Sequence, residues 1–285
     1  MHTLYVSDLD GTLLNGEQRL SEPTIEAVNA WIAAGGSFSV ATARSWDSAG
    51  PLLAPLRLRL PVVLMNGVFL YDPVSGTYIV SNLLDRDTAL DLIATEERAG
   101  LHPIVYTVNG RNEFKIYYKG LFNPSEHLYV TSRLERGDER FRLVDEFRIP
   151  SDEAIMEVNV IGTEEELAAT YKLASERAGL MCHFGPDIYS PGYYWLEIND
   201  ALANKRDGVA QLKQRLQADR IVCFGDNLND LPMFEIADEA FAMGNAHPIV
   251  RERATGVLAT NAEDGVARYL QTIPFPKQSD KSYVT

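Results

Sequence analysis

The segment Thr3–Leu14, which reads TLYVSDLDGTLL, decides the fold of this chain. Its first five residues are β-rich with an apolar centre, so we expect a buried strand over 3–7 that ends just before Asp8. Side chains two apart on an extended chain point the same way, and Gly11 permits a sharp turn. The carboxylates of Asp8 and Asp10 should therefore emerge together at the edge where open α/β sheets bind ligands. One acid can attack while the other handles a proton, although the bare DxDG string also fits an ordinary acidic turn.

Outward from this segment, apolar runs of strand length alternate with stretches of helical period. Ser21 and Pro23 signal the start of a helix, whose apolar face continues until Gly35-Gly36. Further strands are expected over 37–41 and 62–65, followed by a hairpin over 68–80. This alternation predicts an α/β fold with a Rossmann-like parallel sheet covered by helices.

The pattern changes between Leu83 and Tyr189, where strands come in pairs and helices separate them. A helix over 87–99 precedes a strand pair around Asn109-Gly110, and a later strand precedes a capping box formed by Thr163 and Glu166. We read this as an inserted α+β domain, after which a strand over 193–198 resumes the α/β pattern. The expected organisation is a core domain of 1–82 and 190–270, a cap domain of 83–189, and a loosely held tail of 271–285.

Composition limits the possible partners. The 285 residues include 26 Lys and Arg against 40 Asp and Glu, a formal net charge of −14 that argues against nucleic acid binding. Cys182 and Cys223 form no CxxC pair, so neither a disulfide framework nor a thiolate zinc site is indicated. No signal peptide pattern and no long apolar run occurs, which predicts a cytoplasmic protein without membrane contact. The sequence carries no signal for an oligomeric state.

A second acidic cluster, Gly225–Asp230, reads GDNLND and follows the apolar strand expected at 220–224. Neighbouring strands of a parallel sheet present their carboxyl ends on one side, so Asp226 and Asp230 can converge with the acids of the first segment. Clustered carboxylate oxygens suit a hard divalent cation with oxygen ligands, and we expect magnesium. The competing interpretation is that Asp226 or Asn227 only caps the next helix, and both roles can coexist.

Two weaker signals also fall at expected sheet ends. Thr42, Ala43 and Arg44 end one strand and offer a hydroxyl and turn amides to an anion, and Lys205 opens a later helix with a point positive charge. Taken alone, each is more often structural or solvated. The ordered set of four motifs, each after an expected strand, is a much stronger indication of a functional site.

In this order, DLDGTL, ATAR, Lys205 and GDNLND resemble the four motifs of the haloacid dehalogenase superfamily. The large insertion between the second and third motifs resembles the Cof-like branch of magnesium-dependent phosphatases, which carry an α/β cap there. The resemblance covers nearly the whole chain up to Leu270. It implies that Asp8 is a nucleophile forming an aspartyl-phosphate and that Asp10 is the general acid and base.

The resemblance also implies the other site residues. The magnesium ligands would be Asp8, the backbone carbonyl of Asp10, and Asp226, supported by Asn229 or Asp230. The phosphoryl oxygens would be bound by Thr42 and Lys205, next to Ala43 and Arg44, with Asn66 and Gly67 on the substrate side. Two positions depart from the family pattern: Ala43 replaces a usual glycine, and Arg206 replaces a glycine that commonly follows the lysine. Ala43 keeps its backbone N–H, so phosphate binding should survive unless that position needs a positive φ.

The combined expectation is a magnesium-dependent phosphatase acting on small phosphorylated metabolites, with sugar phosphates favoured. A phosphomutase or other phosphotransferase on the same scaffold is the alternative enzyme, and a non-catalytic phosphometabolite sensor is the alternative outside enzymes. A nicotinamide-binding enzyme is disfavoured because no GxGxxG follows the first strand. We expect the insertion to act as a lid that selects the leaving group, because all four motifs lie outside it.

Overall fold

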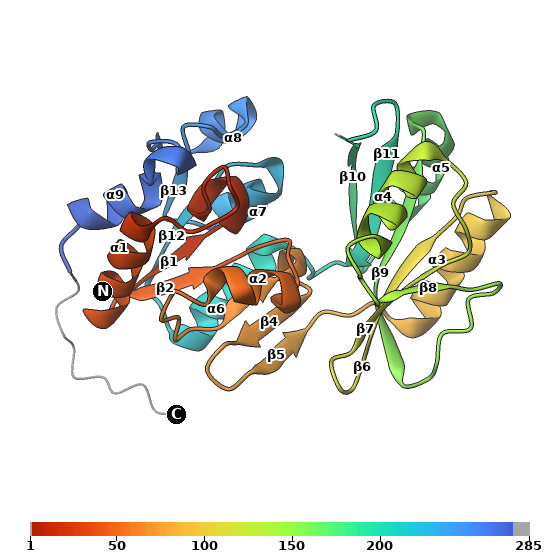
Figure 1. The fold of residues 1–285 in the computed structure, drawn as a ribbon, viewed down its shortest axis with the longest axis horizontal. Helices are drawn as coiled ribbons and strands as arrows, with labels where there is room; N and C mark the ends of the chain where they lie inside the picture. The colour runs from red at the N-terminus through yellow and green to blue at the C-terminus, as the bar shows by residue number, and fades with distance from the viewer. Residues whose placement is uncertain (1, 188, 276–285) are drawn as a thin grey trace. The chain divides into compact units, whose positions relative to one another are not determined.

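The computed structural model describes residues 2–187 and 189–275 and divides into two compact units, which Figure 1 shows. Unit 1 combines the segment that ends at Ser81 with the segment that begins at Ala203. Unit 2 is Asn82–Leu202. The chain therefore leaves unit 1 once and returns to it once.

The main sheet of unit 1 is parallel throughout, with the strand order β14-β13-β12-β1-β2. Its strands are β1 (Thr3–Ser7), β2 (Ser37–Val40), β12 (Arg220–Gly225), β13 (Glu239–Ala242) and β14 (Gly256–Val257). Leu4, Val6 and Val222 on the central strands are fully buried. Such continuous apolar strands suit a sheet covered on both faces, and the predicted α/β core is confirmed.

The helices of unit 1 are α1 (Glu22–Ala33), α2 (Trp46–Leu53), α6 (Lys205–Leu216), α7 (Leu231–Glu235), α8 (Pro248–Arg253) and α9 (Gly265–Thr272). Ser21 caps α1 as its position indicated, because its hydroxyl accepts a hydrogen bond from the Thr24 amide at 3.1 Å. The sequence pattern did not predict α2, which carries Pro51 in its interior. A small antiparallel sheet completes the unit, formed by β3 (Val62–Leu64), β4 (Phe69–Asp72) and β5 (Thr77–Ser81).

Unit 2 is built on a six-stranded sheet with the order β10-β11-β9-β6-β7-β8. Its elements are α3 (Arg86–Arg98), β6 (Ile104–Asn109), β7 (Phe114–Tyr118), α4 (Pro124–Leu134), β8 (Phe141–Leu143), β9 (Glu153–Gly162), α5 (Glu164–Ser175), β10 (Leu180–Pro186) and β11 (Tyr194–Asp200). Val160 of β9 packs with Leu92 of α3 and Leu167 of α5. Its neighbour Ile161 packs with Val130 of α4. Because successive strand residues face opposite sides, α4 lies on one face and α3 and α5 lie on the other.

The point at which the chain returns from unit 2 to unit 1 differs from the expected one. We expected the strand near 193–198 to belong to the core, but β11 pairs antiparallel with both β9 and β10 and so belongs to unit 2. The core resumes at Ala203 rather than at residue 190. Alternating residues such as Trp195 and Leu196 indicate a strand, but the partner strand is set by long-range pairing that no local pattern encodes.

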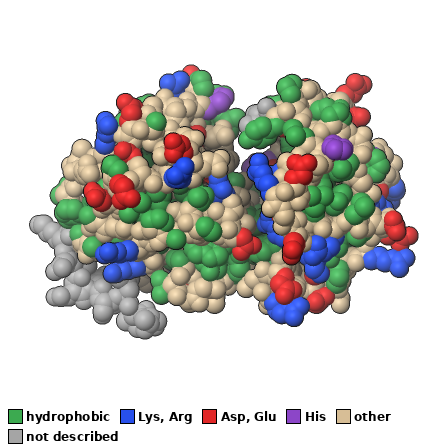
Figure 2. Space-filling view, in the orientation of Figure 1, with side chains coloured by type: hydrophobic (Ala, Val, Ile, Leu, Met, Phe, Trp, Pro, Cys, Tyr) green, Lys and Arg blue, Asp and Glu red, His purple; other side chains and the backbone are tan. Residues whose placement is uncertain are grey.

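Only the start of the expected tail falls within the described residues. Gln271 and Thr272 belong to α9, and residues 276–285 of the tail lie outside the described part. Among the described residues, none of the helices combines the length and the apolar character needed to cross a bilayer. On the face of the molecule in Figure 2, basic side chains are interspersed with acidic ones over both units.

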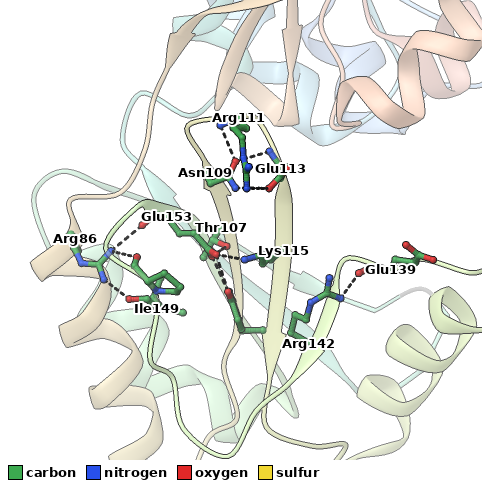
Figure 3. A network of polar contacts seen from close by, with 12 residues as sticks. Arg86, Thr107, Asn109, Arg111, Glu113, Lys115, Glu139, Arg142, Ile149 and Glu153 are labelled. Carbon is green, nitrogen blue, oxygen red and sulfur yellow. Dashed lines mark hydrogen bonds and ion pairs between the residues drawn. The ribbon is translucent and has the colours of Figure 1, made fainter.

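A buried carboxylate ties the β6–β7 hairpin to β9, as Figure 3 shows. Glu153 is 3% exposed and accepts hydrogen bonds from Thr107 Oγ1 at 2.7 Å and from the Tyr117 hydroxyl at 2.9 Å. The ammonium group of Lys115 pairs with the same carboxylate. Burial raises the pKa of Glu153, but the hydrogen bonds from these three side chains outweigh it and lower that pKa below its usual value. The charged form of Glu153 is therefore part of the folded unit.

We predict that Glu153→Ala lowers the free energy of unfolding of unit 2 by about 2–4 kcal/mol, because three donors lose their acceptor. The matched control is Glu113→Ala on the same hairpin, since Glu113 pairs with Arg111 at the surface. That control should lower the free energy of unfolding far less, because a surface ion pair contributes little. Urea unfolding monitored by circular dichroism measures both variants, and similar small losses in the two would refute the role assigned to Glu153.

Candidate active site

Parallel pairing brings the first and fourth motifs together at the carboxyl edge of the main sheet. Ser7 is the register partner of Phe224, and the Asp8 amide donates a hydrogen bond to the Phe224 carbonyl at 2.9 Å. Asp8 and Asp226 therefore leave adjacent strands at the same level. Asp8 is 5% exposed, so its carboxylate lies inside the protein rather than at its surface.

A buried ammonium group joins the third motif to this edge. Lys205 Nζ lies 2.5 Å from Asp8 Oδ1 and 2.7 Å from Asp230 Oδ1, and its side chain is fully buried. Burial lowers the pKa of Lys205, but the two carboxylates outweigh burial and raise it above its ordinary value. Lys205 is therefore a fixed positive charge between two motifs that are far apart in the sequence.

Asp230 contacts both Lys205 and the backbone of its own motif. Besides its contact with Lys205, its Oδ2 accepts hydrogen bonds from the backbone amides of Asp226 at 2.8 Å and Asn227 at 3.0 Å. The side chain is fully buried. These contacts fix the loop that presents Asp226, so the structure gives Asp230 a positioning role in addition to its charge.

The carboxylates of this edge form the acidic cluster that the sequence predicts. Asp8, Asp226 and Asp230 each offer an oxygen atom, and these atoms lie within 4.8 Å of one another. Burial and the neighbouring carboxylates raise the pKa of Asp8, and burial followed by the charge of Asp230 raises the pKa of Asp226 to about 6. Closely spaced hard oxygen donors with unfavourable mutual charge fit a divalent cation such as Mg²⁺.

Asp10 and Arg44 form a separate pair beside this cluster. Arg44 Nε donates to Asp10 Oδ2 at 2.7 Å and Arg44 Nη2 donates to Asp10 Oδ1 at 2.6 Å, a bidentate contact. Arg44, which we expected next to the phosphate-binding residues, pairs its guanidinium with the carboxylate of Asp10 in the structure. Asp10 is therefore held in a fixed orientation by the second motif.

The turn at Met65–Gly67 packs against the second and third motifs. The backbone N–H of Asn66 donates a hydrogen bond to the Thr42 carbonyl at 3.0 Å. The Thr42 hydroxyl accepts one from the backbone N–H of Arg44 at 3.1 Å. Gly67 has a φ of 110°, and an added Cβ would lie 2.2 Å from the Asn204 carbonyl oxygen. Only glycine allows this approach, which holds the turn against the start of the helix that carries Lys205.

The remaining predicted residues take supporting positions. Asn229 Nδ2 donates to Asn66 Oδ1 at 3.2 Å, which joins the fourth motif to the Met65–Gly67 turn. Ala43 is not among the described residues with a positive φ, so its side chain imposes no backbone strain there. Arg206 lies on the surface, with Nη1 3.5 Å from a carboxylate oxygen of Glu235.

Sequence reasoning missed two contacts of the first motif. Thr12 Oγ1 donates to Asp226 Oδ1 at 3.0 Å, and its position directly after Gly11 was the available signal. Asn245 Nδ2 donates to the Gly11 carbonyl at 2.8 Å, and no motif pointed to it. Gly11 has a φ of 75°, which favours glycine, and an added Cβ would lie 2.4 Å from Asp226 Oδ2.

Comparisons with known proteins agree with this arrangement. YitU of Bacillus subtilis, a 5-amino-6-(5-phospho-D-ribitylamino)uracil phosphatase, is 29% identical over 274 residues, which cover 94% of this chain and 96% of YitU. The pyridoxal phosphate phosphatase YbhA of Escherichia coli is 27% identical over 275 residues, covering 92% and 95% of the two chains. The crystal structure of TM0651 from Thermotoga maritima superposes with a TM-score of 0.75 at 26% identity and covers 96% of this chain and 98% of that one.

The match to a family model is equally extensive. The model of the haloacid dehalogenase-like hydrolases matches residues 5–270, which include all four motifs and the whole of unit 2. A hydrolase of that name from Bacillus subtilis shares the fold, with a TM-score of 0.74 at 22% identity over 95% of this chain and 99% of its own. The resemblance seen in the motifs is confirmed, and the chain belongs to the haloacid dehalogenase-like hydrolases, a family of enzymes.

Proposed function

We propose that this enzyme is a magnesium-dependent phosphatase that hydrolyses small phosphorylated metabolites through an aspartyl-phosphate on Asp8. The observation that carries the proposal is the buried contact of Lys205 with Asp8 and Asp230, which sets a positive charge beside a carboxylate at the sheet edge. The relatives YitU and YbhA are named phosphatases of small phosphate monoesters, which supports the same reaction class here. Sugar phosphates are the substrate class we propose to screen first, and a cytoplasmic location remains a prediction.

The acidic cluster would hold the metal. Asp8 and Asp226 would supply carboxylate oxygens, the Asp10 carbonyl would complete the set, and Asp230 would support it while paired with Lys205. Bound Mg²⁺ supplies Lewis-acid stabilisation of phosphoryl charge and relieves repulsion between the nucleophile and an anionic substrate. Asn229 reaches toward Asn66 and has a supporting role in this arrangement.

In the first half-reaction, an Asp8 carboxylate oxygen attacks phosphorus and the bond from phosphorus to the leaving oxygen breaks. Asp10 donates a proton to that oxygen, so the product leaves as an alcohol. In the second half-reaction, Asp10 takes a proton from water, and the water oxygen attacks phosphorus while the bond from phosphorus to the Asp8 oxygen breaks, which releases phosphate. Asp8 is thereby regenerated as a carboxylate.

The remaining site residues would bind the phosphoryl group or orient Asp10. Lys205 and the Thr42 hydroxyl would bind the equatorial phosphoryl oxygens, which carry the charge of a phosphoryl-transfer transition state. Arg44 orients Asp10 through its bidentate contact. Asn66 and Gly67 would line the substrate side of the site, next to Thr42.

We predict different losses for the two acids of the first motif. Asp8→Asn should lose nearly all turnover because an amide is a poor nucleophile, whereas Asp10→Asn should lose about 10²- to 10⁴-fold because proton transfer is impaired. The exposed Asp145→Asn serves as the control and should match wild type. Phosphate release from p-nitrophenyl phosphate measures all three, and near-wild-type rates in Asp8→Asn would exclude covalent catalysis at that residue.

A further prediction concerns metal dependence. Exhaustive chelation should abolish turnover and added Mg²⁺ should restore it, because the clustered acids otherwise face an anionic substrate. Asp226→Ala should raise the Mg²⁺ concentration for half-maximal activity by about 10-fold or more while the fold remains intact. Full turnover after chelation, or an unchanged magnesium response in Asp226→Ala, would overturn the ligand assignment.

Another prediction concerns unit 2, which we propose selects the leaving group. Replacing Asn82–Leu202 by a short linker should preserve slow hydrolysis of p-nitrophenyl phosphate, because all four motifs lie in unit 1. The differences in kcat/KM among phosphorylated metabolites should become smaller. If a folded, monodisperse variant retained the substrate ranking of the parent, specificity would have to lie in unit 1 instead.

A further inference from the structure

The loop 243–247 of unit 1, which connects β13 to α8, contacts both segments that carry the proposed metal ligands. Asn245 Nδ2 donates a hydrogen bond to the Gly11 carbonyl at 2.8 Å, which belongs to the turn of the first motif. The backbone N–H of His247 donates one to the Asp226 carbonyl at 2.8 Å, which belongs to the fourth motif. We call loop 243–247 the bridging loop, because it joins these two motifs.

The turn of the first motif depends on contacts of this kind for its shape. The turn is closed by a hydrogen bond from the Leu14 N–H to the Leu9 carbonyl at 2.9 Å. Within it, Gly11 has a φ of 75° and Asp10 has a ψ of 125°, so neither residue is helical. Glycine has more backbone freedom than other residues, so contacts must hold such a turn in one conformation. Asn245 supplies a contact at the glycine that follows the Asp10 carbonyl.

The side-chain amide of Asn245 is oriented by the backbone on its other side. Its Oδ1 accepts a hydrogen bond from the backbone N–H of Asn261 at 3.0 Å. Because one end of the amide accepts this bond, its NH₂ group is directed at the Gly11 carbonyl. Asn245 itself is exposed, so hydrogen bonds rather than burial hold its side chain. Both ends of the amide are therefore used to fix the turn.

Repulsion between the acids explains why the two motifs need a tether. An added Cβ on Gly11 would lie 2.4 Å from Asp226 Oδ2, so the turn lies directly against this carboxylate. Oxygen atoms of Asp8, Asp226 and Asp230 lie within 4.8 Å of one another, and like charges at this distance favour separation of the motifs. A contact that keeps the motifs together before a cation binds lowers the cost of assembling the site.

We propose that Asn245 is a positioning residue for the metal site, which raises the affinity of the enzyme for Mg²⁺ by holding the first-motif turn against the Asp226 loop. This inference rests on the proposed function, in which Asp8, the Asp10 carbonyl and Asp226 hold the metal. Residues outside the ligand set commonly tune metal affinity through the orientation of the ligands. The bridging loop is thereby a fifth segment of the active site, beside the four motifs.

Calorimetric titration of Mg²⁺ into the metal-free enzyme tests the inference without turnover. Asn245→Ala should raise the Kd for Mg²⁺ by about 3- to 10-fold, the ratio that corresponds to the loss of one hydrogen bond. The Mg²⁺ concentration that gives half-maximal hydrolysis of p-nitrophenyl phosphate should rise by a similar factor. Circular dichroism checks that the variant keeps the fold.

The matched control is Asn29→Ala in α1. Asn29 Nδ2 also donates to a backbone carbonyl, that of Pro55 at 3.0 Å, and its Oδ1 also accepts from a backbone N–H, that of Arg57 at 2.7 Å. None of these residues belongs to a motif. Both substitutions should lower the free energy of unfolding in urea by similar amounts, because they remove the same kinds of bond. Only Asn245→Ala should change the Kd for Mg²⁺.

The outcomes separate the inference from the proposed function. Wild-type enzyme that binds Mg²⁺, together with an Asn245→Ala variant of the same Kd, would overturn the inference alone. An equal rise of the Kd in Asn29→Ala would do the same, because it would trace the effect to lost stability. Wild-type enzyme that binds no Mg²⁺ and hydrolyses p-nitrophenyl phosphate without it would overturn the metal assignment of the proposed function, and the inference with it. A higher Kd confined to Asn245→Ala would support the inference.

Discussion

The buried ammonium group of Lys205 is the constraint on which the active-site architecture depends. An unpaired charge inside a protein costs several kcal/mol or more, so Lys205 must keep contact with both Asp8 and Asp230. One carboxylate follows β1 and the other follows β12, while Lys205 begins α6. Satisfying one ammonium group therefore fixes a helix start against the ends of two adjacent strands.

The same constraint explains several contacts around the site. Asp230 can hold Lys205 only while its loop is compact, and that loop is closed by the Asp226 and Asn227 amides on its second oxygen. The close approach of Gly67 to the Asn204 carbonyl holds the neighbouring turn against the same helix start. Gly11 and Gly67 thus allow a close approach that a larger residue would prevent. Lys205 holds the same segments together through its charge.

Much of this could be predicted from the sequence. Buried parallel strands read as continuous apolar runs, and acids placed directly after two such runs must meet if the strands are neighbours, as Asp8 and Asp226 are. The partners of individual strands and side chains could not be predicted in the same way. The strand Tyr194–Asp200 has the pattern of any half-buried strand, and only its antiparallel partners assign it to unit 2. Likewise, nothing local shows that Arg44 pairs with Asp10.

The central claim is that Asp8, held beside Lys205, is the group that receives the phosphoryl group. A crystal structure of the enzyme with Mg²⁺ and fluoroberyllate, a mimic of a phosphoryl group on a carboxylate, tests it most directly. The account predicts beryllium bonded to an Asp8 carboxylate oxygen, with Lys205 beside the adduct and Asp10 free of it. An adduct on Asp10 or on any other carboxylate, or fluoroberyllate held without a bond to the protein, would contradict it.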